Sequence, residues 1–285
     1  MEVPPVGFGT YRIQSHPDAV ALVALALRAG YRLVDTAQVY ANEAAVGEAV
    51  RASGIPRAQL FVSTKVSPKI MTSEDAVYTG ALASLHKLGL DYVDLFLIHW
   101  PGTSKRNVTQ PNTENRLAAW RALERVQKEG RARFIGVSNY TPSHLLELLN
   151  NPCITTRPYL NQIEFHPLHI PYDTLEVCRN HGIRIQAYSS LGEGALVQPD
   201  GDSRLKVLDE IAARCGCTRA QLLLKWAIKQ NVSVIPKSSS FERMKENFHL
   251  DHFNVGDEDM LVLSNLTVTG GLEPKKFCWD PRLVA

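Results

Sequence analysis

Cysteine is scarce in this sequence and follows no pattern. The 285 residues contain five cysteines, an odd number at irregular spacings, which suits reduced thiols in a reducing compartment better than a disulfide framework. Cys215-Gly-Cys217 lacks a second pair of ligands, and the proline between His166 and His169 argues against coordination from one helical face. We therefore expect no bound metal.

An excess of charge and a long apolar run are also missing. The formal net charge is +2, with Lys and Arg dispersed along the chain, so nucleic acid is not expected as a partner. No apolar run approaches the roughly 18 residues that span a bilayer, and Met1 to Thr10 lacks the basic and apolar regions of a signal peptide. The expectation is a protein without membrane contact and with a cytoplasmic location.

Two common sequence fingerprints are incomplete. Gly7-Phe8-Gly9 is followed by Arg12 where the third glycine of a dinucleotide-binding turn belongs, and Gly136 to Tyr140 lacks the last glycine of a serine-hydrolase elbow. No Walker sequence is present. Any nicotinamide cofactor must therefore be held in another way.

Short apolar runs alternate with segments of helical period along the whole chain. The runs predict eight strands, at Val6–Gly9, Tyr31–Asp35, Leu60–Lys65, Tyr92–His99, Phe134–Ser138, Tyr159–Ile163, Ile183–Tyr188 and Val232–Pro236. The periodic segments predict helices at Ala19–Ala29, Ala44–Ala52, Ala76–Leu88, Leu117–Glu129, Leu145–Leu149, Leu175–Asn180 and Leu205–Ile228. This alternation favours an α/β fold, a single (β/α)8 TIM barrel formed by residues 1–285, over an open doubly wound sheet.

Helix boundary residues agree with these segments. Ser73 precedes two acidic residues at a helix start, and Thr141-Pro142 opens another helix. Glycines that follow a helix and precede a strand predict α-to-β turns at Gly30, Gly89, Gly130 and Gly182.

Charged or polar residues close three of the apolar runs. Asp35, Lys65 and His99 each end a predicted strand, and in a TIM barrel these ends meet at the active-site mouth. A structural ion pair is an equally good reading for any one of them, but Asp35 is the natural partner of a buried Lys65. Tyr40, five residues after Asp35, can reach the same mouth, where Lys65 would lower its pKa and make it a proton donor.

These residues, in Leu-Val-Asp-Thr-Ala-Gln-Val-Tyr40, Val-Ser-Thr-Lys65 and Asp-Leu-Phe-Leu-Ile-His99-Trp-Pro, resemble the catalytic tetrad of the aldo-keto reductases. That family includes aldose reductase, prostaglandin F synthase and 2,5-diketogluconate reductase. The likeness covers nearly the whole chain, since it continues through Gly136–Tyr140, Asn161–Pro167, Ala187–Leu191, Ile235–Ser238, Arg243 and Glu246-Asn247.

The resemblance implies reduction of a carbonyl by hydride transfer from NADPH. Tyr40 would protonate the carbonyl oxygen, Lys65 held by Asp35 would tune Tyr40, and His99 would orient the substrate. Such an arrangement supplies an oriented proton donor, while the hydride chemistry belongs to the cofactor.

The resemblance also implies where NADPH binds. Ser138, Asn139 and Gln162 would bind the carboxamide and Tyr188 would stack on the nicotinamide, although Ser138-Asn139 could instead cap the helix that follows. Lys237, Ser238 and Arg243 resemble the family's site for the 2′-phosphate, a group that NADPH carries and NADH lacks. The expected cofactor is therefore NADPH. The full cofactor set is Thr10, Tyr11, Asp35, Ser138, Asn139, Gln162, Tyr188, Ser189, Leu191, Lys237, Ser238, Arg243, Glu246 and Asn247.

The sequence departs from the family's pattern in places. Only Met1 to Pro5 precede the first strand, so the family's N-terminal hairpin is expected to be reduced or absent. Tyr11 stands where many relatives have tryptophan, and with Tyr40, His99 and Trp100 it forms the expected substrate-binding set. Short loops after Tyr188 predict an open pocket for reactive aldehydes, dicarbonyls or quinones.

Two other functions remain open at this point. Lys65 could be the Schiff-base nucleophile of an aldolase on the same fold, or the chain could bind the cofactor without turnover. The resemblance further implies a monomer that acts on a small carbonyl compound.

Overall fold

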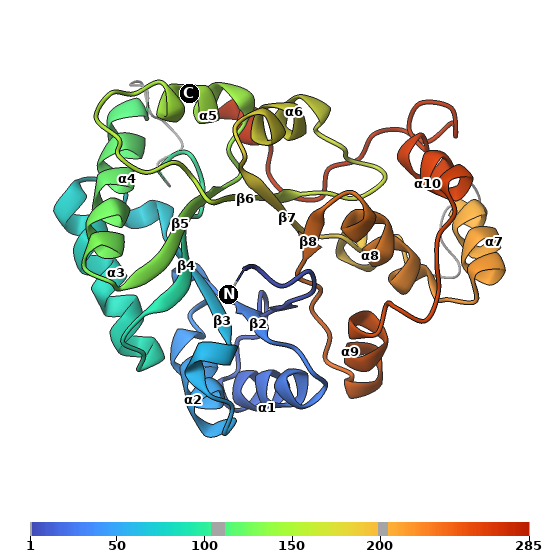
Figure 1. The fold of residues 1–285 in the computed structure, drawn as a ribbon, viewed down its shortest axis with the longest axis horizontal. Helices are drawn as coiled ribbons and strands as arrows, with labels where there is room; N and C mark the ends of the chain where they lie inside the picture. The colour runs from blue at the N-terminus through green and yellow to red at the C-terminus, as the bar shows by residue number, and fades with distance from the viewer. Residues whose placement is uncertain (1, 104–111, 199–204, 285) are drawn as a thin grey trace.

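The computed structural model describes residues 2–103, 112–198 and 205–284. Eight parallel strands form one curled sheet in the order of the sequence, and helices lie on its outer side (Figure 1). The strands are β1 (Phe8–Gly9), β2 (Leu33–Asp35), β3 (Phe61–Val66), β4 (Val93–Ile98), β5 (Ala132–Ser138), β6 (Leu160–Glu164), β7 (Arg184–Tyr188) and β8 (Val232–Val234). The predicted α/β alternation is thus confirmed, and the fold resembles a TIM barrel.

The two ends of the curled sheet approach each other. Val6 and Val234 form a parallel bridge, and the amide of Gly7 donates to the carbonyl of Val234 over 2.8 Å. The amide of Gly9 donates in the same way to Pro236 over 3.1 Å. The segments around β1 and β8 are therefore hydrogen-bonded neighbours.

The helices follow the predicted order with one correction. They are α1 (His16–Arg28), α2 (Glu43–Ala52), α3 (Glu74–Leu88), α4 (Thr113–Lys128), α5 (Pro142–Leu149), α6 (Tyr172–Asn180), α7 (Lys206–Cys215), α8 (Arg219–Lys229), α9 (Phe241–Phe248) and α10 (Asp257–Ser264). The single helix predicted over Leu205–Ile228 is wrong, because Gly216 adopts a left-handed conformation that ends α7 and Thr218 caps a new helix. Helices α9 and α10 were not predicted.

The predicted turn residues have the expected geometry. Ser73 accepts from the amide of Ala76 at the start of α3, and Thr141 forms a capping box with His144 at the start of α5. Ser138-Asn139 therefore does not cap α5, contrary to the alternative interpretation. The four glycines at α-to-β turns all have positive φ, as predicted for Gly30, Gly89, Gly130 and Gly182.

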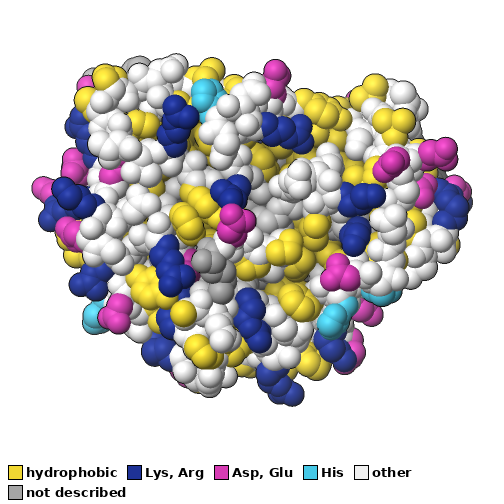
Figure 2. Space-filling view, viewed as in Figure 1, with side chains coloured by type: hydrophobic (Ala, Val, Ile, Leu, Met, Phe, Trp, Pro, Cys, Tyr) yellow, Lys and Arg dark blue, Asp and Glu magenta, His cyan; other side chains and the backbone are white. Residues whose placement is uncertain are grey.

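Apolar side chains cover both faces of the sheet. One cluster lies between strands and helices, and a smaller one fills the inside of the curl with Leu33, Phe61, Leu95, Leu97, Leu160 and Ile235. Val3 packs against this inner cluster, and its amide donates to the Tyr159 hydroxyl over 3.1 Å. Residues before β1 thus cover the inner cluster. Figure 2 shows basic and acidic side chains interspersed on the visible face.

Candidate active site

The alternation of strand side chains places polar groups above the inner apolar cluster. Successive strand residues point to opposite faces, so Asp35 shares the inner face with Leu33, two residues earlier. Lys65 shares that face with Phe61 for the same reason. Because the strands are parallel, these polar residues gather at the carboxyl end of the sheet.

Asp35 and Lys65 form a buried ion pair. Nζ of Lys65 lies 2.5 Å from Oδ2 of Asp35 and donates to the carbonyl of Thr36 over 2.9 Å. The other carboxylate oxygen accepts from the Ser63 hydroxyl at 2.8 Å. The predicted pair is therefore confirmed. Burial lowers the pKa of Lys65, and the charge of Asp35 opposes that shift.

Tyr40 ends the 3₁₀ turn η1 (Gln38–Tyr40), which follows β2. Its hydroxyl lies 3.4 Å from Nζ of Lys65. The predicted net fall of the Tyr40 pKa is wrong, because burial raises that pKa well above 10 and the negative charge of Asp35 raises it further. Asp35 offsets the ammonium charge, so the phenol stays protonated at neutral pH.

His99 follows β4 and meets the edge of Tyr40, with 5.6 Å between the ring centroids. Burial, and then the positive charge of Lys65, hold the pKa of His99 well below its usual value of 6.5. The imidazole is therefore neutral at neutral pH. A neutral imidazole can donate one hydrogen bond without adding charge to the site.

A cavity of about 940 Å³ opens above these residues, a volume near the upper end of the usual range for ligand sites of about 300–1,000 Å³. Thr10 and Lys65 are the two predicted site residues that do not line it; Thr10 is buried and its hydroxyl donates to the backbone of Asp35. The predicted residues that line it are Tyr11, Asp35, Tyr40, His99, Trp100, Ser138, Asn139, Gln162, Tyr188, Ser189, Leu191, Lys237, Ser238, Arg243, Glu246 and Asn247.

Polar groups on β5, β6 and β7 form one side of this cavity. The Tyr188 hydroxyl donates to Asn139 over 2.5 Å. The amide nitrogen of Gln162 donates to Asp35 at 3.0 Å and to Gln186 at 2.7 Å, which leaves its oxygen to accept from a ligand amide. This wall can therefore recognise a carboxamide next to an aromatic ring.

Positive charge lies at the other end of the cavity, between β8 and α9. Lys237 and Ser238 belong to the connecting loop, and Arg243 lies in the first turn of α9. Within residues 2–103, 112–198 and 205–284, neither Lys237 nor Arg243 forms an ion pair with the protein. Two such cations beside a helix N-terminus suit a phosphate dianion.

Several cavity residues were missed by sequence reasoning. Arg12 and Glu193 form an exposed ion pair across the opening, with 3.2 Å between nitrogen and oxygen. Phe277, Cys278 and Trp279 line the cavity from the segment after α10. No strand end or motif marks these positions; their aromatic composition alone is a weak signal.

The structure weighs against two alternative sites. Lys65 is fully buried, paired with Asp35 and absent from the cavity wall, which is poor placement for a Schiff-base nucleophile. In the described part of the chain, no three His, Cys, Asp or Glu side chains are grouped to hold a metal ion. No helix among those residues is long and apolar enough to cross a membrane.

Comparison with known proteins gives a consistent result. The model of the Aldo/keto reductase family matches residues 5–266. A 9,11-endoperoxide prostaglandin H2 reductase of Trypanosoma cruzi is 38% identical, with 99% of this chain and 92% of that protein covered. A glyoxal reductase of Bacillus subtilis is also 38% identical, over 91% of this chain and 87% of that protein.

A solved structure agrees with the sequence comparisons. The Bombyx mori aldo-keto reductase in complex with NADP is 32% identical, with a TM-score of 0.82 over 92% of this chain and 89% of that one. Family, relatives and fold all point to an oxidoreductase that acts on carbonyl or alcohol groups. The chain therefore belongs to the aldo-keto reductase family.

Proposed function

We propose that this protein reduces aldehydes and ketones to alcohols with NADPH, and that Tyr40 is the proton donor. The observation that carries the proposal is the position of the Tyr40 phenol on the cavity wall, 3.4 Å from the Lys65 ammonium and edge-on to His99. An acid, a cation and a neutral imidazole together suit a carbonyl oxygen that becomes an alkoxide.

The bound NADPH would supply the hydride. The neutral ring of His99 donates a hydrogen bond that orients the substrate oxygen. The O–H bond of Tyr40 breaks as a new O–H bond forms on the product, and a phenolate remains. Lys65 stabilises this phenolate until a solvent proton restores the phenol.

The residues of the cavity fit NADPH. Lys237, Ser238 and Arg243 provide two cations and a hydroxyl for the 2′-phosphate, which NADH lacks. At the other end, Tyr188 offers an aromatic face, and Gln162 retains an amide oxygen for the carboxamide. The NADP complex of the Bombyx mori enzyme supports the same cofactor.

Reactive aldehydes, dicarbonyls and quinones are the substrates that we propose. The aromatic rings of Tyr11, Trp100 and Trp279 line the cavity, and flat carbonyl compounds can stack on them. The relative named glyoxal reductase points to the dicarbonyl class.

We also propose that the sheet closes as one (β/α)8 barrel domain. The backbone hydrogen bonds of Gly7 and Gly9 to the segment after β8 support this closure. The monomeric state and the cytoplasmic location stay predictions.

Tyr40→Phe tests the proposal. We expect kcat with methylglyoxal or 4-nitrobenzaldehyde to fall by about 1,000-fold, in the range of a lost general acid, while the Kd for NADPH changes less than about twofold. NADPH consumption at 340 nm measures the first quantity, and quenching of protein fluorescence measures the second. NADH is run in parallel.

Tyr140→Phe is a matched control, since Tyr140 is also buried and its hydroxyl has no partner among the described residues. It should keep kcat. Equal losses in both variants, or wild-type protein that binds NADPH tightly without turnover on any of these carbonyls, would contradict the proposal; the latter outcome would favour the binding-protein alternative.

A further inference from the structure

The segment that follows α10 forms part of the cavity wall. Phe277, Cys278 and Trp279 line the cavity, and Trp279 meets Trp100, which follows β4, with 5.8 Å between ring centroids. Trp279 is 73% exposed, so few packing contacts fix the position of its side chain. The shape of this wall therefore depends on what holds the neighbouring backbone.

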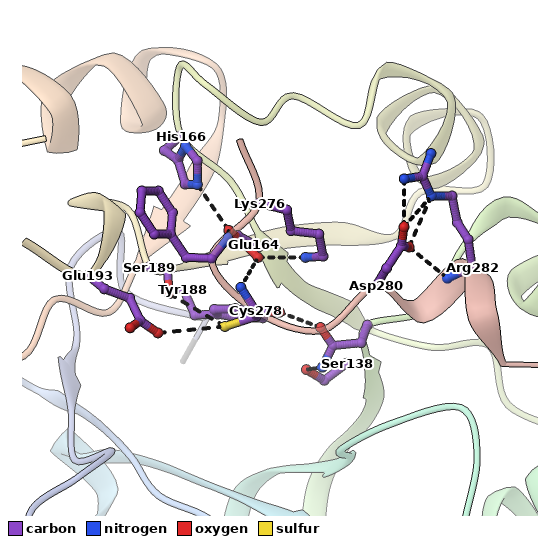
Figure 3. Close-up of polar contacts among 12 residues, drawn as sticks. Ser138, Glu164, His166, Tyr188, Ser189, Glu193, Lys276, Cys278, Asp280 and Arg282 are labelled. Atoms are coloured by element: carbon purple, nitrogen blue, oxygen red, sulfur yellow. Dashed lines mark hydrogen bonds and ion pairs between the residues drawn. The ribbon is translucent and has the colours of Figure 1, made fainter. Parts of the chain in front are cut away.

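One buried carboxylate holds that backbone. Glu164, the last residue of β6, accepts from Nζ of Lys276 at 2.5 Å and from the amide of Cys278 at 3.0 Å (Figure 3). It also accepts from the amide of Phe277 at 2.5 Å. Nε2 of His166 lies 3.1 Å from the same carboxylate. Three consecutive residues of the segment thus converge on one side chain that is more than 100 positions away.

The other polar contacts of residues 276–279 are long, and the next backbone hydrogen bonds belong to residues on either side of this segment. The further polar contacts of positions 276–279 involve the Cys278 thiol, which lies 3.9 Å from Ser189 and 4.0 Å from Glu193 and also contacts the Tyr188 hydroxyl. The amide of Lys275 donates to the carbonyl of Leu168 before the stretch, and the carbonyl of Val284 meets His144 after it. Glu164 is therefore the principal anchor of the wall residues.

The electrostatics make this anchor firm. Burial alone raises the pKa of Glu164, but hydrogen bonds from His166, Lys276 and Phe277 outweigh burial and hold the pKa at about 2. The carboxylate is therefore charged at neutral pH. A buried charge without its partners is costly, so the segment is held whenever the fold is intact.

We infer that Glu164 is a positioning residue for substrate recognition, fixing residues 276–279 so that Phe277 and Trp279 form a wall for bulky aromatic carbonyl compounds. This inference rests on the proposed carbonyl reduction. Glu164 does not line the cavity, and the side chains of the tetrad do not contact it. Its loss should therefore weaken binding of large substrates much more than the chemical step.

Glu164→Gln is the test, because the side-chain amide has the same shape as the carboxylate but lacks its charge. Its NH2 group would also face groups that can only donate, the Lys276 ammonium and two backbone amides. With 1-naphthaldehyde we expect KM to rise about tenfold at nearly constant kcat, the effect of losing a charge-assisted hydrogen bond at the wall. With methylglyoxal, which has no aromatic ring to pack against Trp279, kcat/KM should fall less than about threefold. Hydrogen exchange of residues 273–284 should accelerate, while the Kd for NADPH stays near the wild-type value.

Lys276→Met probes the same anchor from the other side, in case Glu164→Gln folds poorly. It should raise KM for 1-naphthaldehyde about threefold, and the double variant should be no worse than Glu164→Gln, since the two changes remove one interaction. Asp280→Asn is the matched control on the same segment, because the ion pair that Asp280 forms within the described residues is with nearby Arg282 and not with Glu164 or its partners. It should leave both KM values unchanged.

Equal losses on both aldehydes, additive effects of the two variants, or unchanged hydrogen exchange would overturn the inference. Should the wild-type protein prove inactive, binding of 1-naphthaldehyde to the NADPH-loaded protein, followed by fluorescence, still decides the matter. Failure of carbonyl reduction and failure of the Glu164 anchor are thus distinguishable.

Discussion

Two buried aspartates at opposite ends of the sheet share the same chemistry but have different surroundings. Asp35 closes β2 and pairs with Lys65 at the carboxyl end, beside the cavity. Asp94 is the second residue of β4, near the amino end, and is also fully buried. Both carboxylates carry a cation and further donors, so burial and pairing alone do not distinguish a catalytic group from a structural one.

The partners of Asp94 close its site completely. Arg57 and Arg133 contact the two carboxylate oxygens at 2.7 and 2.9 Å, and the amide of Val62 donates at 2.9 Å. Both guanidinium groups also lie over the ring of Tyr92. This network links β3, β4 and β5 and does not line the main cavity. Arg57 and Tyr92 line a separate, smaller cavity of about 300 Å³, so the network stabilises the sheet without reaching the main cavity.

The comparison shows what makes the Asp35 pair functional. Nζ of Lys65 lies 3.4 Å from a phenol that lines the cavity, whereas the two arginines that pair with Asp94 are partly exposed and do not line it. A buried ion pair next to a cavity can act on a reacting atom; the same pair beneath the sheet acts on folding.

Asp35→Asn is expected to have the largest effect. Without the carboxylate, burial favours the neutral form of Lys65, so the cation that stabilises the Tyr40 phenolate is lost. We expect kcat per folded molecule to fall by about 1,000-fold. Steady-state kinetics on protein with its folded fraction fixed by circular dichroism measures this. A loss below tenfold would make Asp35 structural, like Asp94.

Asp94→Asn should show the opposite pattern. Two cations would lose their buried partner, so the free energy of unfolding should fall by about 3 kcal/mol. Activity per folded molecule should stay within about twofold, because the network does not reach the cavity. Urea unfolding and kinetics below the transition test both. Any large drop in kcat would show that the two ends of the sheet are coupled.

A pH series separates the two ends further. The pKa of His99 is lowered in the folded state. Below about pH 6.5 His99 is therefore protonated in the unfolded chain but stays neutral in the folded protein, so its contribution to stability falls as pH falls. Between pH 7 and 5.5 this costs about 1 kcal/mol. His99→Gln should remove that part of the pH dependence, while Asp94→Asn should leave it. Urea unfolding of the three proteins at both pH values measures the difference.

The carboxyl-end cluster could be predicted from the sequence for a simple reason. Asp35, Lys65 and His99 each end an apolar run, and parallel strands bring such ends together without knowledge of the loops. The protonation of Tyr40 could not be predicted, because it depends on how far Asp35 offsets Lys65 and on the depth of burial. These are properties of packing.

The other omissions have the same origin. Phe277 and Trp279 lie far along the chain from any strand, and their place at the cavity depends on the long-range contact with Glu164. The break between α7 and α8 depends on one left-handed glycine within a continuous helical period, Gly216. Periodicity detects faces of regular elements but not where irregular segments dock.

Arg133→Gln should have the smallest effect, and it tests how much each arginine on Asp94 contributes to the free energy of unfolding. The Arg133 side chain is 37% exposed, whereas that of Arg57 is 23% exposed, and Asp94 keeps Arg57 and the Val62 amide when Arg133 is neutralised. Because exposed partners of an ion pair contribute little, we expect the free energy of unfolding to fall by about 1 kcal/mol, with a Tm lower by about 2 °C. Differential scanning calorimetry measures this, and Arg57→Gln, the more buried partner, should cost more. If the two arginine variants lose equal stability, burial does not decide the contribution of each arginine, and the Asp94 carboxylate needs both cations as Asp35 needs Lys65.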